Sequence, residues 1–236
     1  MATRFLVQNI PCGDPVADLA QALIGAVKSQ FDSLNTGSYW NWYPVEINNN
    51  DQVALADFMA CHGFPVVPQL SASGHAASGH TASGHTASGH TASGHTASGH
   101  TASGHAASGN TAFGYTALAE VHLARCAGDA DAPVTSGACV HQDDEGGLTP
   151  GNYRTLIIYA KNTATGGGLA VFDGDPKGTC TIVTTRPPPD HVRAVLMDGN
   201  VWHCPVDLTG EGVRESFVFQ LPALQDWHKK ASGIRK

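Results

Sequence analysis

Three residues of this chain could form a metal site, although one of them is distant in sequence from the other two. His141 and Asp143 lie in the stretch "CVHQDD", and His203 lies much later, in "GNVWHCPV". Residues i and i+2 of a β-strand project from the same face, so His141 and Asp143 would point together. Two imidazoles and one carboxylate form a facial triad that holds Fe(II) and leaves coordination positions open. His141, Asp143 and His203 are therefore the candidate metal-ligating and catalytic residues.

Each of these residues also has a simpler interpretation. His141 could be a surface histidine beside the solvated acidic turn "HQDDEGG", and His203, between apolar neighbours, could be a core histidine. Cys139 and Cys204 flank the proposed ligands and suggest a zinc site with softer ligands instead. On a strand, however, Cys204 would point away from His203, which argues against joint ligation.

A second candidate site lies in "VRESFVFQL", a mainly apolar stretch that reads as a strand. Alternation places Arg214 and Ser216 on one face and the two phenylalanines on the other. An inward arginine costs free energy unless it meets an anion, and a guanidinium binds a carboxylate through two parallel hydrogen bonds. Arg214 and Ser216 therefore look like an anchor for a carboxylate. The simpler alternative is an Arg–Glu pair at a sheet edge.

The N-terminal part of the chain reads as helical with one strand. Asp14 can cap a helix in which Pro15 takes the first position and apolar residues recur every four positions. A shorter helix is expected from Asp51, closed by Gly63, and a third one is expected to end at Gly128. The helical stretches are "GDPVADLAQALIGAVKSQF", "DQVALADFMACHG" and "YTALAEVHLARCAG", and the strand lies in "SYWNWYPVEI".

The C-terminal half consists of short β-prone runs separated by Gly, Pro and Asp. This spacing predicts an α+β protein built on a double-stranded β-helix, or jelly roll, with flanking N-terminal helices. The runs are "GACVHQD", "YRTLIIYA", "GLAVFDG", "TCTIVTT", "RAVLMDG", "VWHCPV" and "VRESFVFQL".

A pentad repeat interrupts the chain at residues 73–117, where units such as SGHTA contain almost no large side chain to bury. We interpret it as a flexible low-complexity insertion, with metal capture by its seven histidines, glycosylation or a low-grade solenoid as alternatives. The predicted organisation has an N-terminal helical and β flank (1–72), the insertion (73–117) and a jelly-roll core (118–236).

Composition narrows the class of protein. The net charge of −7 and the pI near 5.9 disfavour a surface that coats nucleic acid, so no strong nucleic-acid-binding surface is expected. The six cysteines form no CxxC pair, and we find neither a signal peptide nor a run of 18 apolar residues. We therefore expect a cytoplasmic or nuclear protein with no membrane partner and with free thiols.

Five stretches taken together resemble the Fe(II)/2-oxoglutarate-dependent dioxygenases. The resemblance covers about residues 137–221 and includes the order HxD…H…RxS. It implies that His141, Asp143 and His203 bind iron, and that Arg214 and Ser216 hold 2-oxoglutarate. The stretches are "CVHQDDEGG", "NYRTLIIY", "TGGGLAVFDG", "VLMDGNVWHCPV" and "GVRESFVFQL".

The same resemblance implies the cofactors and the reaction. Fe(II), 2-oxoglutarate as co-substrate and O2 are expected, with ascorbate as a candidate addition, and the products are succinate, CO2 and a hydroxylated or oxidised C–H position. Tyr153 and Arg154 are candidates for contact with the co-substrate or the substrate, although either could be a packing or surface residue.

Two branches of the family compete for the substrate. "YRTLIIYAKNTATGGGLAVF" is similar to prolyl 4-hydroxylases, which act on peptides but usually anchor 2-oxoglutarate with lysine, whereas this chain has Arg214. "GEGVRESFVFQL" looks more like the TET and J-base oxygenases of methylated pyrimidines. The rival class of function is a non-catalytic jelly-roll protein whose His-rich arm binds a metal or a partner.

Overall fold

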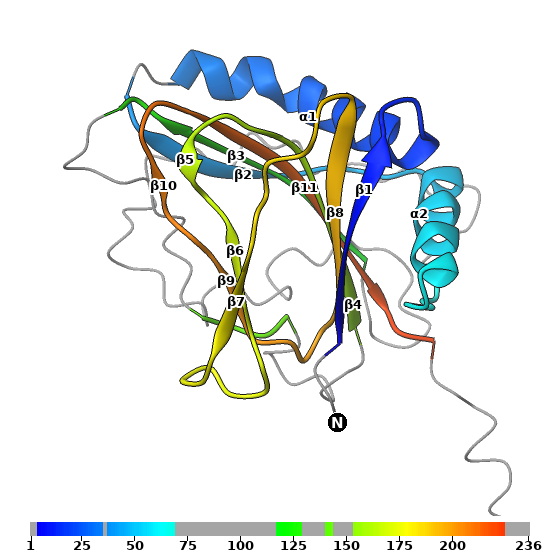
Figure 1. Cartoon of the computed structure of the whole chain (residues 1–236). Helices are drawn as coiled ribbons and strands as arrows, with labels where there is room; N and C mark the ends of the chain where they lie inside the picture. The colour runs from blue at the N-terminus through cyan, green and yellow to red at the C-terminus, as the bar shows by residue number, and fades with distance from the viewer. Residues whose placement is uncertain (1–3, 35–36, 69–116, 129–139, 144–152, 225–236) are drawn as a thin grey trace, which may run out of the picture.

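The larger sheet of the protein has six strands in the part of the chain that the structure describes, and all neighbouring strands run antiparallel (Figure 1). The structure is a computed structural model, and it describes residues 4–34, 37–68, 117–128, 140–143 and 153–224. The order across the sheet is β1 (Phe5–Pro11), β8 (His191–Asp198), β4 (Tyr153–Asn162), β11 (Gly212–Pro222), β3 (Leu118–Cys126) and β2 (Tyr39–Pro44).

Shorter strands form the opposite wall of the molecule. β7 (Cys180–Val183), β6 (Leu169–Phe172) and β9 (His203–Pro205) make a three-stranded sheet, and β10 (Leu208–Thr209) pairs with β5 (Thr165–Gly166). Beyond β9, His141 adds an isolated antiparallel bridge to His203, with backbone N–H···O distances of 3.0 and 2.9 Å. These walls form an antiparallel β-sandwich, consistent with the predicted jelly roll.

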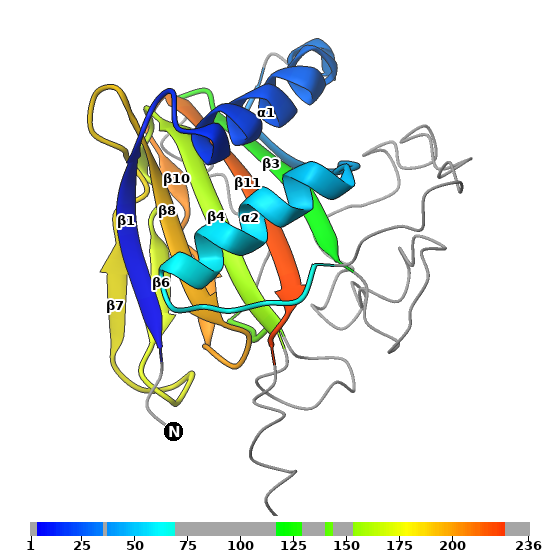
Figure 2. The same cartoon turned by 90° about the vertical axis from the view of Figure 1, so that its right-hand side faces the viewer.

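Two helices cover the outer face of the larger sheet (Figures 1 and 2). They are α1 (Pro15–Leu34) and α2 (Asn49–Cys61). Asp14 caps α1 as predicted, because its Oδ1 accepts from the Val16 N–H at 2.9 Å. The part of the chain described contains no helix that is both long enough and apolar enough to cross a membrane.

The larger sheet has one apolar layer on each face. On the outer face, Phe217 and Phe219 of β11 join the core beneath the helices. Val218 lies between them in sequence but packs on the inner face, with residues such as Tyr159 and Val171 between the two sheets. The alternation predicted for residues 213–221 is thus confirmed, and it turns Arg214 and Ser216 toward the inside of the sandwich.

The helix predicted to end at Gly128 is wrong, because residues 118–126 form β3. Leu, Ala, Glu and Arg favour a helix locally, but this segment pairs with β2 on one side and with β11 on the other. Val121 and Leu123 enter the outer core, whereas Ala124 and Cys126 are buried on the inner face. Tertiary pairing therefore overrides the local propensity.

Smaller differences concern the ends of elements. α2 begins at Asn49 rather than Asp51, because the Asn48 Oδ1 accepts from the Asp51 N–H and caps the helix, while Gly63 follows its end at φ +81° as expected. Residues 38–47 contain β2 as predicted, whereas β1, β5 and β10 were not predicted. Most of the repeat falls within 69–116, and Cys139 within 129–139, which are outside the described residues.

The sheets also hold N-terminal and C-terminal segments together. β1 pairs with β8 and β2 pairs with β3, so both edges of the larger sheet come from the predicted flank at 1–72. The domain boundaries themselves stay a prediction.

Gly166 offers a test of the glycine-rich turn that precedes β6. Its φ is +73°, and a Cβ there would lie 2.6 Å from the Asp207 carbonyl oxygen. We expect Gly166→Ala to lower the free energy of unfolding by about 2 kcal/mol or more, because it adds backbone strain and a clash. The matched control is Gly25→Ala in α1, where a Cβ meets nothing within 4 Å, and which should stabilise by about 0.5–1 kcal/mol. Urea denaturation of both variants measures the difference, and equal effects would contradict the strain argument.

Candidate metal centre

The predicted ligands meet inside one end of the sandwich. The ligand atoms of His141, Asp143 and His203 all lie within 4.8 Å of one another. Among the described residues, no other group of three or more His, Cys, Asp and Glu side chains is close enough to hold a metal ion. The Asp143 Oδ1 is 3.8 Å from the His141 Nε2 and 3.7 Å from the His203 Nε2. The backbone bridge between the two histidines brings their rings to 4.4 Å between centroids. Two imidazole nitrogens and one carboxylate oxygen thus converge from residues far apart in the chain.

Hydrogen bonds orient two of the three side chains. The Nδ1 of His203 lies 3.0 Å from the Val201 carbonyl oxygen, so the tautomer that donates there leaves Nε2 as a lone-pair donor toward the cluster. Thr155 of β4 donates its hydroxyl to the Asp143 Oδ2. Because that bond holds one carboxylate oxygen, the other oxygen is turned toward the two histidines.

The charge state of His203 also suits a ligand. Burial lowers the pKa of His203, and the neighbouring His141 lowers it further, while the Asp143 carboxylate acts in the opposite direction. A lowered pKa favours the neutral imidazole near pH 7, and neutral imidazole is the form that binds a metal. The side chains of His203 and Asp143 are 6% and 7% exposed, whereas that of His141 is 26% exposed. The cluster is therefore reachable from the His141 side.

Thr155 was not predicted as a site residue, and its role can be measured. We expect Thr155→Val to weaken Fe(II) binding by about 10- to 100-fold, because an isosteric methyl group cannot hold the Asp143 carboxylate. Thr155→Ser keeps the hydroxyl and should recover most of the affinity. Anaerobic Fe(II) titrations of the three proteins with 2-oxoglutarate present, followed by the charge-transfer band of iron that also binds the keto acid, test this. Equal affinities for the valine and serine variants would remove Thr155 from the site.

Arg214 is a buried cation within the same interior. Its guanidinium Nη1 donates to the carbonyl oxygens of Gly167 and Val206 at 3.2 and 3.4 Å, and the residue is 5% exposed. None of the ion pairs among the described residues involves Arg214. Burial lowers its pKa, and the nearby Asp207 opposes that change without forming an ion pair. A buried guanidinium with spare donors can take an anion from outside the protein.

The alternative pairing of Arg214 with a glutamate does not occur. Glu215 lies on the outer face, where it forms an ion pair with Lys28 of α1. Ser216 faces inward with Arg214, 3% exposed, and its hydroxyl donates to the His122 carbonyl at 3.4 Å. A bulge between Glu215 and Ser216 changes the register with β4. Direct contact of Ser216 with a ligand stays a prediction.

Tyr159 is a second residue that was not predicted. It pairs with Ser216 in the β4–β11 ladder and packs in the inner core. Burial raises the pKa of Tyr159 to about 12, although the charge of Arg214 lowers it in part. The phenol therefore stays protonated and can donate a hydrogen bond beside the guanidinium. The signal in the sequence is its place in "TLIIY", two and four residues after inward-facing positions of the same strand.

The structure separates the two candidates at the start of β4. Tyr153 is 7% exposed and alternates onto the inner face with Thr155 and Ile157. Arg154 alternates onto the other face, where its Nε lies 3.1 Å from the Asp198 Oδ1 in the neighbouring strand. Arg154 is therefore not brought to the metal cluster. The alternative of a zinc site with cysteine ligands also loses support, because Cys204 is not part of the metal-ligand cluster.

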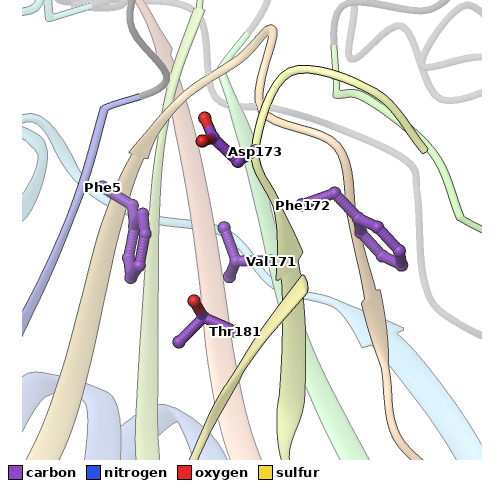
Figure 3. Close-up of a pocket in the computed structure, with 5 residues that line it drawn as sticks. All are labelled: Phe5, Val171, Phe172, Asp173 and Thr181. Atoms are coloured by element: carbon purple, nitrogen blue, oxygen red, sulfur yellow. The ribbon is translucent and has the colours of Figure 1, made fainter. Parts of the chain in front are cut away.

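A pocket of about 280 Å³ opens at the edge of the sandwich between β1 and β7. Figure 3 shows Phe5, Val171 and Thr181 gathered around it, with Asp173 nearby and Phe172 turned away. Val171 pairs with both Thr181 and His203, so the pocket and the metal cluster lie in one layer of the sandwich. None of the predicted site residues lines this pocket.

Comparisons with known proteins give structural neighbours only. No family model and no curated protein matches the sequence. A prolyl-4-hydroxylase from Pseudomonas putida is 14% identical with a TM-score of 0.42, covering 93% of this chain and 92% of that chain. HygX from Streptomyces hygroscopicus, solved with nickel and 2-oxoglutarate bound, is 12% identical with a TM-score of 0.39, covering 93% and 83%.

A third solved structure, IDO from Bacillus thuringiensis, is 15% identical with a TM-score of 0.32. The match covers 47% of this chain and spans about half, 46%, of that protein. Independently of these neighbours, the His–Asp–His cluster fits the metal-binding motif of the Fe(II)/2-oxoglutarate-dependent oxygenases that the sequence resembles.

Proposed function

We propose that this protein is a non-haem Fe(II)- and 2-oxoglutarate-dependent dioxygenase that hydroxylates or oxidises an unactivated C–H bond. The observation that carries the proposal is that the interior of the sandwich has a metal-ligand cluster at one end and a buried cation at the other. One end has the two imidazoles and the carboxylate, and the other has the buried guanidinium of Arg214 with no carboxylate partner among the described residues. The first suits Fe(II), and the second suits the distal carboxylate of 2-oxoglutarate.

The residues between the two ends support the same assignment. Ile157 and Val218 are paired between the Thr155 level and the Tyr159–Ser216 level of the sheet. Apolar side chains thus line the interval that a dicarboxylate would span, while polar groups stand at both of its ends. Such an arrangement orients the co-substrate and limits the access of water.

Each residue then has a defined role. His141, Asp143 and His203 would hold the metal, and Thr155 and the Val201 carbonyl orient two of these ligands. Arg214 would bind the distal carboxylate, with Tyr159 and Ser216 beside it. Bound Fe(II), together with 2-oxoglutarate and O2, supplies the oxidising chemistry that releases succinate and CO2. Ascorbate stays a proposed addition.

The substrate classes suggested by the sequence are a methylated pyrimidine in nucleic acid and a prolyl or other side chain in a protein. Both place an unactivated C–H bond at the metal, so the proposed chemistry is the same for either. The identity of the substrate depends on the surface that surrounds the open side of the cluster.

The function is tested with purified full-length protein. Anaerobic addition of Fe(II) and 2-oxoglutarate should give a weak visible charge-transfer band, and subsequent O2 should release succinate even without substrate. The band requires iron and the keto acid at one site, so iron held by the repeat histidines would not produce it. Absence of both the band and succinate, with iron loading confirmed, would count decisively against an oxygenase and favour the non-catalytic alternative.

A further inference from the structure

A polar and aromatic cluster on β2 and β3 is not used by the proposed chemistry. Glu120 and His122 are two residues apart on β3, so both project from the same face, and the His122 Nε2 lies 3.0 Å from the Glu120 Oε2. Trp42 of β2 and Ser216 of β11 are the direct neighbours of His122 in the sheet. Because Val121 lies in the outer core, Glu120, His122 and Trp42 belong to the inner face.

One end of this cluster is covered and the other is reachable. Trp40 meets the His122 ring edge-on, at 5.9 Å between centroids and 80° between planes. Trp40 itself packs against a buried cluster that includes Leu208 of β10, so this end is covered. Further along β3, the side chains of His122 and Glu120 are 28% and 15% exposed. Among the described residues, no lysine or arginine pairs with Glu120.

The register of the sheet places this cluster beside the candidate metal centre. Thr155, which holds the Asp143 carboxylate, pairs with Gln220, and Gln220 pairs with Leu118. Glu120 is the next inward-facing residue of β3 after Leu118. Thr155 and Glu120 are thus separated by two strand spacings across the sheet and by two residues along the strand direction. With standard strand dimensions this corresponds to roughly 12 Å between their Cα atoms. One small molecule or one extended side chain can therefore reach both.

Charge indicates what this surface would bind. Each of the six arginines in the described part of the chain already contacts a protein group: Arg4 lies over Phe64, Arg125 and Arg154 pair with Asp32 and Asp198, Arg186 and Arg193 bind backbone carbonyls and Asn9, and Arg214 is buried. The guanidinium of Arg214, which has spare donors, is buried and out of reach of a polyanion, and the whole chain carries −7. A carboxylate and an indole on the same face of adjacent strands, two residues apart in register, suit a cation instead, through charge and cation–π attraction.

We propose that Trp42, Glu120 and His122 form the part of the substrate site that binds a positively charged amine. This inference rests on the proposed oxygenase function, because it names the substrate class of that same site. His122 donates to one oxygen of Glu120 and fixes the carboxylate, so the other oxygen can accept from the ammonium group. Trp42 supplies an aromatic surface in the adjacent strand.

The test uses three probes of similar size, namely pentylamine, pentan-1-ol and pentanoate, added to the full-length protein without iron. Tryptophan fluorescence reports binding, and Trp42→Phe identifies the responding residue. We expect pentylamine to bind at least about tenfold more tightly than pentan-1-ol, with pentanoate weakest. Glu120→Gln should abolish that preference, whereas the matched control Glu46→Gln, an exposed glutamate just after β2, should retain it.

The outcomes separate this inference from the proposed function. No preference for the amine in the wild-type protein, or an undiminished preference in Glu120→Gln with an unchanged Tm, would overturn the inference. Tight binding of a single-stranded oligonucleotide that Glu120→Gln leaves unaltered would overturn it as well and favour nucleic acid. Because fluorescence needs neither iron nor turnover, selective binding of pentylamine with no release of succinate would support the cation surface and defeat the oxygenase.

Discussion

Asp143→Asn is expected to lower the affinity for Fe(II) by more than about 100-fold and to abolish the release of succinate from 2-oxoglutarate. The change removes the only anionic ligand of the cluster and leaves two neutral imidazoles with a weakly coordinating amide. Losing a residue that merely orients a ligand already costs about 10- to 100-fold, so losing the ligand should cost more. Asparagine is nearly isosteric and can still accept from the Thr155 hydroxyl, so the fold should be retained.

The seven repeat histidines require a specific readout for this experiment, because they could bind iron elsewhere. The charge-transfer band with 2-oxoglutarate provides it, since it follows only iron that also binds the keto acid. Asp57→Asn is the matched control, because Asp57 is an exposed carboxylate on α2 and α2 lies on the opposite face of the larger sheet. A band of normal intensity in Asp143→Asn, with succinate release within about threefold of wild type, would remove Asp143 from the centre.

The sequence predicted most reliably which face of a single strand each side chain occupies. The period of two along a strand is a local property, so "VRESFVFQL" correctly separated Arg214 and Ser216 from Phe217 and Phe219. The same rule was applied to His141 and Asp143, which do meet in the cluster. Asp143, however, lies in a turn after the single bridge residue His141, so strand alternation is not what brings them together. The convergence of His203 with them is not local, because it depends on the bridge between residues 141 and 203, and only the order of the residue types suggested it.

The helix predicted to end at Gly128 failed because strand pairing in the folded protein outweighs the local helical propensity of this segment. Residues 118–126 have the composition of a helix, yet the sheet needs a strand between β2 and β11 and can bury Val121 and Leu123 there. Because this strand was missed, the proximity of Trp42, His122 and Ser216 could not be predicted. The sequence also did not reveal that Arg154 lies beside Asp198 of the neighbouring strand, and its contact with a substrate stays a prediction.

Arg214→Met is expected to raise the KM for 2-oxoglutarate by about 100-fold while changing the affinity for Fe(II) by less than about threefold. Removing one partner of a buried charge pair costs about 2–5 kcal/mol, and the ligand carboxylate would lose the guanidinium that is buried among the described residues. Arg214→Lys keeps the charge but offers a single point contact instead of a fork, so its KM should lie between the two. Steady-state succinate release measures the KM. An anaerobic Fe(II) titration at saturating 2-oxoglutarate, followed by the charge-transfer band, measures the iron affinity of this site.

Thermal stability gives the same substitution a second readout that does not require turnover. A ligand at 100 times its dissociation constant stabilises the folded state by about 2.7 kcal/mol. Adding 2-oxoglutarate at that level to protein already saturated with a redox-inert metal should therefore raise the Tm of wild type clearly, and the Tm of Arg214→Met by much less. Without ligand, the variant should be about as stable as wild type, because methionine removes a buried charge that has no ion-pair partner among the described residues.

Arg193→Met is the control for both readouts, since this arginine lies on β8 and binds Asn9 and the Thr184 carbonyl near the surface. It should keep both the KM and the ligand-induced rise in Tm. If Arg214→Met kept the rise in Tm as well, the buried guanidinium would be a structural clamp on the Gly167 and Val206 carbonyls rather than a carboxylate anchor. The interior would then hold a metal-binding cluster without the co-substrate site that oxygenase chemistry needs.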